Sequence, residues 1–238
     1  MHTPTPDAIL QVHPALAAEL PQLRIGWIIA RGLPPSAPTP SSLEAAIEAT
    51  LSAPAEAQSP LSGPEGDALR KGIRDLLRGH GYAPTGRGKP ASEYLAQATA
   101  KGDFPRISAL VDANNLASLR SGWPASILDL PKALGDAEGL EIRRGQPEER
   151  YVFNSAGHEI KLKGLPLVAR RGGEAIGNPV KDAMLAKVGP ETVDTISIVY
   201  TSAAVADDDA LAALLQSYGQ WLGDAGARSV ETGLLRAS

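Results

Sequence analysis

The spacing of apolar residues predicts five helices along the chain. Between Ala68 and His80, leucine and isoleucine recur every three or four residues while arginine and lysine fill the positions between them, as in a helix with one buried face. Similar spacing, or a run of good helix formers after a capping residue, marks the other four. The five expected helices span about residues 42–52, 68–80, 92–101, 107–121 and 208–222. We expect their caps at Ser41–Ser42, Asp67, Ser92 and Asp207–Asp209.

Short apolar runs bounded by glycine, proline or asparagine predict the strands. Residues 23–30 are rich in β-branched side chains between two proline-containing breakers, which is typical of a buried strand. Residues 195–201 alternate and then become continuously apolar, as in the central strand of a sheet. Four shorter runs have the spacing of an antiparallel meander: residues 140–142, 151–153, 158–162 and 167–169. Helices first, strands second and a helix last predict an α+β fold.

We expect a single domain over residues 1–238. A chain of 238 residues, of which 43% are hydrophobic, can bury one substantial core. Residues 1–66 are predicted to hold an N-terminal strand and a segment rich in proline and serine. Residues 67–201 are expected to form the core of the fold, and residues 202–238 a C-terminal helix and tail.

Charge is unevenly distributed along the chain. The net charge of −4 disfavours non-specific attachment to polyanions. Two inner segments are basic, because residues 69–109 carry 8 basic and 3 acidic side chains and residues 140–190 carry 9 and 6. Such surface is a candidate for local contact with a phosphate backbone, and a solvated surface with scattered ion pairs is the alternative. Only 4% of residues are aromatic, which argues against a stacking platform for single-stranded nucleic acid.

Several kinds of chemistry are disfavoured by composition. The absence of cysteine removes disulfides, thiolate zinc sites and cysteine nucleophiles. The four histidines His2, His13, His80 and His158 are scattered, so we expect neither a metal nor a cofactor. There is no Gly-x-Ser-x-Gly elbow and no Walker sequence. Because the N-terminus lacks the pattern of a leader and no apolar run could span a bilayer, we expect a cytoplasmic protein with no membrane or DNA partner.

The segment Phe104–Pro124 carries the most informative pattern. Its leucine and isoleucine residues lie at helical intervals from Ile107 to Leu119, so we expect them to pack on one helix face. The same helix contains Asn114 and Asn115, although the asparagine amide competes with the backbone for hydrogen bonds inside helices. We therefore expect a role other than helix stability for this pair.

Further motifs follow this segment in a recognisable order. The run Pro-Arg-Ile, then Val-Asp-x-x-Asn-Leu, a Gly-x-Pro turn and Asp129 precede residues 177–182, 191–192 and 196–200. This order resembles the editing module of the bacterial phenylalanyl-tRNA synthetase β-subunit, and more closely the freestanding proteins built from that module alone. The resemblance covers most of the chain from about residue 14 to about residue 200. It implies an α+β fold with helices packed on a mixed, largely antiparallel sheet or β-sandwich-like core.

The resemblance also implies a function. Enzymes of this module hydrolyse the ester between a wrong amino acid and the terminal ribose of tRNA, so the chain is expected to be a trans-editing aminoacyl-tRNA deacylase whose partner is the aminoacylated 3′ end of tRNA. Positioned water and a stabilised oxyanion suffice for that labile bond. The implied catalytic residues are Asn115 and Asp182, the implied substrate-binding residues are Asn114, Ser126, Asn178 and Lys181, and the implied tRNA-binding residues are Arg106, Arg143 and Arg144.

The sequence departs from the synthetases at Ser126, where they commonly have a histidine that could serve as a general base. One alternative is therefore a non-catalytic tRNA- or amino-acid-binding module, and another is an unrelated small-molecule enzyme on the same fold. For Asn115 the alternative role is to buttress the adjoining turn, and for Lys181–Asp182 it is a surface pair at the start of a loop. Asp112 and Asp129 are expected to be architectural.

Overall fold

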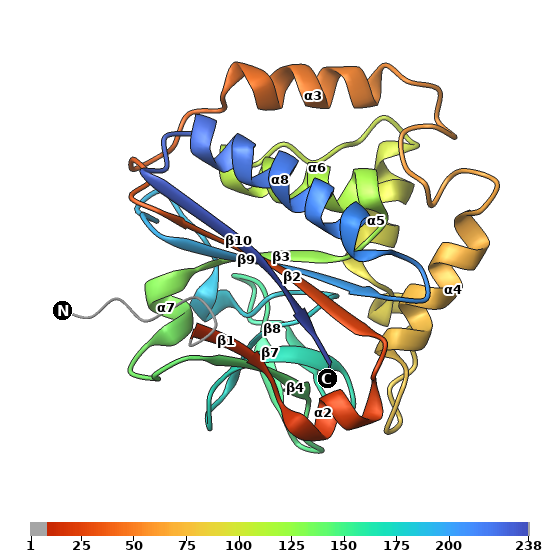
Figure 1. Cartoon of the computed structure of the whole chain (residues 1–238), viewed down its shortest axis with the longest axis vertical. Coiled ribbons are helices and arrows are strands. Elements are labelled where there is room, and N and C mark those ends of the chain that lie inside the picture. Colours follow the sequence, from red (N-terminus) through yellow and green to blue (C-terminus); the bar gives the residue numbers. More distant parts are fainter. Residues whose placement is uncertain (1–8, 238) are drawn as a thin grey trace.

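The computed structural model of the protein describes residues 9–237. His2 and the first residues, for which the sequence predicts no leader, lie outside this range. Within it, the strands form two four-stranded sheets and a two-stranded hairpin, and most helices lie on one side of the first sheet (Figure 1). The predicted α+β class is confirmed.

The first sheet has the strand order β10, β2, β9, β3, and all its neighbours are antiparallel. Its strands are β2 (Leu23–Arg31), β3 (Ala125–Asp129), β9 (Thr195–Ser202) and β10 (Ser229–Arg236). The two longest predicted strands, β2 and β9, lie at its centre, as expected for nearly continuous apolar runs. The predicted C-terminal tail contains β10, which pairs with β2 along its whole length.

The second sheet has the order β1, β4, β7, β8. Its strands are β1 (Leu10–Val12), β4 (Leu140–Arg144), β7 (Pro166–Arg170) and β8 (Ala175–Gly177). The β1–β4 pair is parallel, and the other pairs are antiparallel. Together with the first sheet this gives a mixed, largely antiparallel arrangement.

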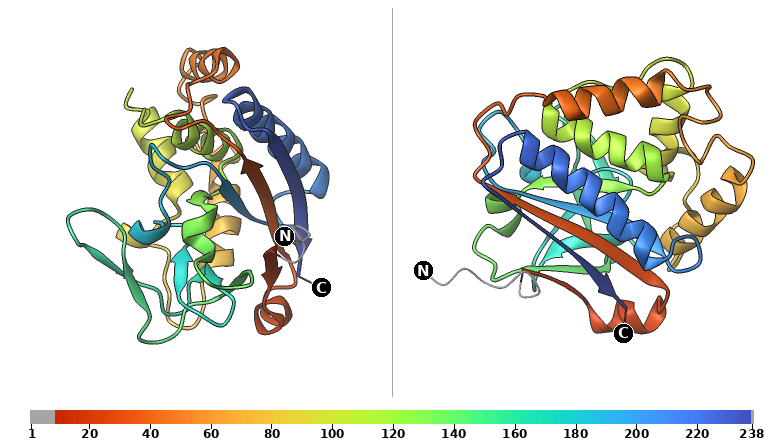
Figure 2. Two further views of the ribbon diagram at one scale, coloured as in Figure 1. Left: turned by 90° about the vertical axis from the view of Figure 1, so that its left-hand side faces the viewer. Right: turned by 45° about the horizontal axis from the view of Figure 1, so that its top comes forward.

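The expected meander is wrong in its pairing. All four predicted runs form strands, but β4 pairs directly with β7, and β5 (Arg150–Val152) pairs with β6 (Glu159–Lys161) as a separate hairpin between them. The hairpin segment projects from the body of the molecule (Figure 2, left). Its strands are mostly exposed and short, so they lack the apolar face that would place them inside the sheet.

The five predicted helices are all present. They are α3 (Ser41–Leu51), α4 (Gly66–Leu77), α5 (Ala91–Thr99), α6 (Ala109–Ser121) and α8 (Asp208–Asp224). Two short helices, α2 (Pro14–Glu19) and α7 (Leu130–Leu134), and two single 3₁₀ turns, η1 (Gly86–Gly88) and η2 (Met184–Ala186), complete the elements of residues 9–237. Figure 1 shows α6 and α8 over the first sheet, α3 outside them, and the second sheet on the opposite side.

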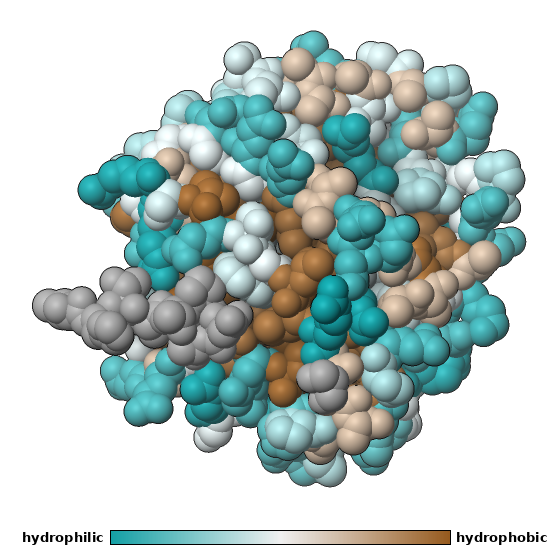
Figure 3. All heavy atoms as spheres, viewed as in Figure 1, coloured by the Kyte–Doolittle hydropathy of each residue, from teal (hydrophilic) through white to brown (hydrophobic). Residues whose placement is uncertain are grey.

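This layering explains why the central strands are buried on both faces. All eight residues of β9 are buried, as are most of those in β2. At Gly26 on β2, an added Cβ would lie 2.9 Å from a methyl group of Leu215 on α8, so the missing side chain lets the helix approach the sheet closely. Hydrophobic residues also form a band across the middle of the face in Figure 3, where β2 and β10 pass in Figure 1.

Local signals at the ends of α6 explain its position. The Ser108 hydroxyl caps its N-terminus by accepting a hydrogen bond from the Val111 N–H, and Gly122 ends it in the left-handed conformation with φ of 72°. Because the helix begins at Ala109, Ile107 precedes it and is 70% exposed. The expectation that Ile107 packs on the buried face is therefore wrong.

Three other predicted caps lie inside the first turn instead. The N-cap residues of α3, α4 and α5 are Pro40, Glu65 and Pro90, none of which forms a side-chain capping bond. Asp207 and Asp129, by contrast, cap α8 and α7 through their carboxylates. The architectural role expected of Asp129 is confirmed.

Candidate functional site

Three of the predicted site residues meet between the two sheets. Ser126 lies on β3 of the first sheet, while Asn178 and Asp182 lie in the loop that follows β8 of the second. The Ser126 Oγ donates a hydrogen bond to Asp182 Oδ1 over 2.7 Å, and the Asn178 backbone N–H donates to the same oxygen over 3.2 Å. Ser126 and Asn178 are buried. We call these three residues the inter-sheet cluster.

The loop that carries Asn178 and Asp182 is shaped by its own side chains. The Asn178 Oδ1 accepts hydrogen bonds from the backbone N–H groups of Val180 at 2.7 Å and Lys181 at 2.9 Å, which is a turn that asparagine favours. Gly177 precedes it, and a Cβ there would lie 2.7 Å from Asp182 Oδ1. Glycine therefore allows the carboxylate to fold back against the backbone.

The environment of Asp182 favours its neutral form. Burial raises the pKa of Asp182 to about 7, although the hydrogen bonds from Ser126 and Asn178 and the charge of Lys187 act in the opposite direction. Asp182 as a whole residue is half-buried. Asp182 is therefore an acid that can gain or lose a proton near neutral pH.

Three tyrosines interact electrostatically with this carboxyl group, and the sequence pattern indicates none of them as site residues. Burial and then the Asp182 charge raise the pKa of both Tyr151 and Tyr200 well above the ordinary value, and burial likewise raises that of Tyr218. The phenols therefore stay neutral and can act as hydrogen-bond donors. Their strand and helix positions indicated burial, but no spacing in the sequence connects them to residue 182.

Asn114 has a structural explanation for its place in α6. It is buried, its Nδ2 donates to the Ala125 carbonyl over 3.2 Å, and its Oδ1 accepts from the Tyr218 hydroxyl over 3.2 Å. The Ser197 hydroxyl in turn donates to the Tyr218 oxygen over 2.9 Å. Asn114 thus joins α6, α8 and the start of β3, the strand that carries Ser126.

Asn115 is not part of this network. It is half-buried, and its side chain forms no hydrogen bond in the part of the chain that the structure describes. Successive residues of a helix project about 100° apart, so its side chain leaves α6 in a different direction from that of Asn114. Its catalytic role stays a prediction.

A basic cavity of about 600 Å³ adjoins the inter-sheet cluster through Lys181. The hairpin β5–β6 and the segment 82–88 form its walls, which contribute Tyr82, Arg87, Gly88, Phe153, His158, Glu159, Ile160 and Lys161. The Lys181 Nζ lies 4.0 Å above the centre of the Phe153 ring, where the ring quadrupole attracts a cation. Cationic and aromatic groups together suit a ligand with phosphate groups and a planar ring.

The cations that line this cavity are not the predicted arginines. Arg143 is 9% exposed and forms a paired hydrogen bond with Glu149 at 2.7 and 2.8 Å. Arg144 pairs with Glu19 at 2.6 Å and also donates to a backbone carbonyl. Their proposed contact with tRNA stays a prediction, although ion pairs already engage both.

Arg106, the third predicted arginine, also forms ion pairs within the protein. It donates to Glu44 on α3 at 2.6 and 3.0 Å and to Asp112 on α6 at 2.8 Å, and these bonds raise its pKa above the ordinary value. The buried Asp112 also accepts the Ile107 N–H at 2.7 Å, which confirms its architectural role. Within residues 69–109, Arg87 lines the basic cavity instead.

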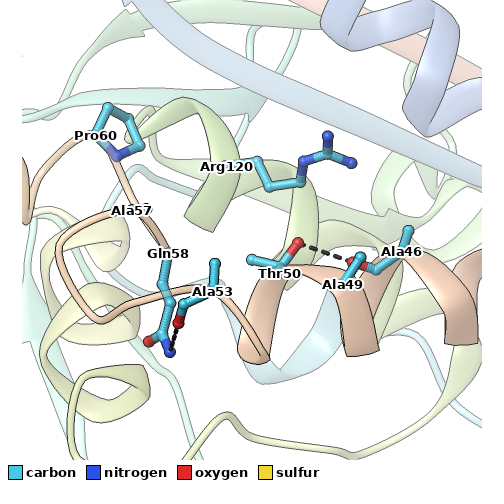
Figure 4. A pocket seen from close by; sticks show the side chains of 8 residues that line it. All are labelled: Ala46, Ala49, Thr50, Ala53, Ala57, Gln58, Pro60 and Arg120. Atoms are coloured by element: carbon cyan, nitrogen blue, oxygen red, sulfur yellow. Dashed lines mark hydrogen bonds between the residues drawn. The ribbon is translucent and has the colours of Figure 1, made fainter.

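A smaller cavity, of about 290 Å³, lies in the helical layer (Figure 4). Alanines of α3 and of the segment after it form its wall, together with Thr50, Gln58 and Pro60, and Arg120 lies across from them. The Thr50 hydroxyl already donates to the Ala46 carbonyl, and the Gln58 amide to the Ala53 carbonyl. No predicted site residue lines this cavity, so we place the candidate site at the inter-sheet cluster and its basic neighbour.

Among residues 9–237, no group of three or more histidine, aspartate or glutamate side chains is placed to hold a metal ion. No helix within that range has the length and apolar character needed to cross a membrane.

No protein-family model and no curated protein matches the chain. Among solved structures it is similar to an N-terminal fragment of the phenylalanyl-tRNA synthetase β-subunit from Pyrococcus horikoshii, with 11% sequence identity and a TM-score of 0.46. The match covers 97% of this chain and 52% of the other, so this chain spans about half the length of that fragment. This is a distant structural likeness, and assignment to the editing module stays a prediction.

Proposed function

We propose that the protein hydrolyses the ester of mischarged aminoacyl-tRNA in trans. The observation that carries this proposal is the position of Asp182. Burial gives its carboxyl a pKa near neutrality, and the residue directly follows Lys181, which lines the basic cavity. A general base works best when its pKa lies near the operating pH.

In this mechanism the Asp182 carboxylate takes a proton from the water that attacks the ester carbonyl, and it returns the proton to the ribose oxygen as the ester bond breaks. Ser126 holds the carboxylate through its hydroxyl, so that the serine present in place of a histidine positions the base rather than acting as one. Lys181 is the cation nearest to the base in sequence, and it neutralises charge on the ester oxygen or on a nearby phosphate. Neither role requires a nucleophilic side chain.

The remaining cavity residues would bind the end of the tRNA. Arg87 and Lys161 supply positive charge for phosphates, and the neighbouring rings of Phe153 and His158, with centres 6.2 Å apart, offer a surface for a base. The side-chain amide of Asn115 has no hydrogen-bond partner among residues 9–237, and it is the second candidate for contact with the substrate.

One observation favours the alternative of a binding module without catalysis. The polar groups of Asn114, Ser126 and Asn178 make hydrogen bonds within the protein, and neither these residues nor Asp182 line the basic cavity. A module that binds the tRNA end through Lys181 and the cavity would need nothing more from them than support of the loop.

Deacylation of a panel of misacylated tRNAs would separate the two functions. The proposal predicts that Asp182→Asn lowers kcat/KM by about 100-fold or more, because it removes the base while keeping the shape. Asp103→Asn, at an exposed aspartate, serves as the matched control. Binding without hydrolysis of any panel member would establish the alternative, and the absence of both would refute both functions.

A further inference from the structure

Tyr151 occupies a central position beside the candidate site. It lies on β5, is 8% exposed, and belongs to a small hydrophobic cluster separate from the main core. Its hydroxyl donates a hydrogen bond to the Lys181 carbonyl over 2.6 Å and accepts one from the Asn178 Nδ2. The phenol therefore contacts both ends of the loop that shapes the site.

The Lys181 carbonyl belongs to the peptide group that joins Lys181 to Asp182. The two side chains leave this peptide toward different surroundings: Lys181 lines the basic cavity, and Asp182 receives the hydrogen bond from Ser126 on β3. Rotation of this one peptide plane would misdirect both groups together. The Tyr151 hydroxyl fixes that plane, and its bond with Asn178 also orients the amide that holds the Val180 and Lys181 N–H groups.

The hairpin that carries Tyr151 has two further contacts, one with this loop and one with the segment that follows it. The Lys187 Nζ donates to the Phe153 carbonyl over 2.7 Å, and the Lys181 ammonium lies over the Phe153 ring. The wall of the basic cavity and the carboxyl group of the inter-sheet cluster are thus connected through one short hydrogen-bonded segment.

We propose that Tyr151 is the positioning residue of the site, whose hydroxyl holds the Lys181–Asp182 peptide so that Lys181 faces the basic cavity while Asp182 faces Ser126. The proposal deepens the proposed function and rests on it for its catalytic meaning. Tyr151 itself touches no substrate, and it acts through the two residues that it aligns.

Amide hydrogen exchange tests the positioning without any ligand or activity. Tyr151→Phe keeps the ring and removes the hydroxyl, so the Val180 and Lys181 amides are expected to exchange about tenfold faster or more. The Lys132 amide, capped by Asp129, serves as an internal control and is expected to keep its rate. In the wild-type protein, the Tyr151 hydroxyl proton should exchange slowly enough for detection by NMR. Unchanged exchange in the variant, or a rapidly exchanging wild-type hydroxyl, would overturn the proposal.

A titration distinguishes positioning from general support of the fold. Release of the loop exposes the Asp182 carboxyl to water, so the NMR titration midpoint of that carboxyl should move down from about 7 in Tyr151→Phe. Thr50→Val, which removes a hydroxyl bonded to a backbone carbonyl on α3, is expected to leave the midpoint unchanged. Equal midpoints in Tyr151→Phe and the wild type would refute the alignment.

Binding of adenosine monophosphate supplies the test at the cavity. If Tyr151 acts through Lys181, the affinity loss in the double variant Tyr151→Phe/Lys181→Ala equals that of Lys181→Ala alone, whereas independent roles give additive losses. Additive losses would contradict the proposal. A wild-type protein that binds no nucleotide would count against the proposed function instead, while hydrogen exchange and titration would still decide the role of Tyr151.

Discussion

Asp182 makes the stability of the protein depend on pH in a direction opposite to that of most carboxylates. Burial raises its pKa to about 7, whereas an aspartate in an unfolded chain titrates near 4. Between these values the folded protein holds a proton that the unfolded chain has released. The contribution of Asp182 to the free energy of unfolding is therefore fully present below about pH 4 and is lost as the pH rises to about 7. It amounts to at most about 4 kcal/mol.

Asp182→Asn should remove this dependence. The amide resembles the protonated carboxyl in shape and charge, so the variant is expected to exceed the wild type in stability by about 1–2 kcal/mol at pH 5 and by about 4 kcal/mol at pH 8. Urea denaturation between pH 5 and pH 8 measures the difference, with Asp103→Asn as the exposed control. Parallel stability curves for Asp182→Asn and the wild type would show that the carboxyl is ionised in the fold.

Much of the inter-sheet cluster could be predicted from sequence, but its surroundings could not. Asn178, Lys181 and Asp182 lie within one short loop, and a family-like spacing also indicated Ser126. Tyr151 comes from a hairpin 27 residues before Asn178, and its contact depends on how that hairpin folds onto the loop. Contacts of this kind depend on tertiary packing, to which hydrophobic spacing along the chain gives no direct guide.

At the scale of the element, the attachment of α3 to α6 depends on Arg106. This residue joins Glu44 on α3 to Asp112 on α6, and Asp112 is nearly fully buried. Arg106→Met would leave the Asp112 carboxylate without its charged partner, which is expected to lower the free energy of unfolding by about 1–3 kcal/mol. Urea denaturation at pH 7 measures the loss.

Arg120→Met is the matched control, because Arg120 is exposed and forms no ion pair within residues 9–237. Its effect on the free energy of unfolding should remain within about 0.5 kcal/mol. A variant Arg106→Met that unfolds like the wild type but binds tRNA more weakly would assign Arg106 to the RNA surface instead of the helix junction.

The predicted helices all exist, but three of them begin earlier than predicted, and α3 and α5 do so for a common reason. Ser41 and Ser92 have the side-chain chemistry of caps, but an extended proline precedes each helix and the serine already lies in the first turn. Proline readily adopts the extended backbone of an N-cap position. The helix therefore begins earlier than the preference for serine at the N-cap indicates. At α6, where Ser108 does cap through its hydroxyl, the missed boundary explains the exposed Ile107.

At the scale of the whole molecule, the pairing of strands was less predictable than their presence. The runs at 140–142 and 167–169 become neighbours in one sheet although two other strands lie between them in sequence. β10 was missed because Gly233 interrupts its apolar pattern, and glycine is unfavourable in isolated strands. The register of β10 with β2 explains why this strand contains a glycine, since Gly233 lies directly opposite Trp27.

The Trp27 ring covers the position where Gly233 would otherwise carry a side chain. An added Cβ would lie 2.3 Å from the ring, and Trp27 is 5% exposed, so either the ring or β10 must move. Gly233→Ala is therefore expected to lower the free energy of unfolding by about 1–3 kcal/mol, as overpacking does in other cores. Gly223→Ala on α8 is the matched control, because its nearest neighbour would lie 3.9 Å away and alanine favours a helix by about 0.5–1 kcal/mol. If urea denaturation shows a lower free energy of unfolding for Gly233→Ala and a higher one for Gly223→Ala, β10 is held by the packing of Trp27 across the strand pair. A higher free energy of unfolding in both variants would show that the edge of the sheet moves to accept the added methyl group.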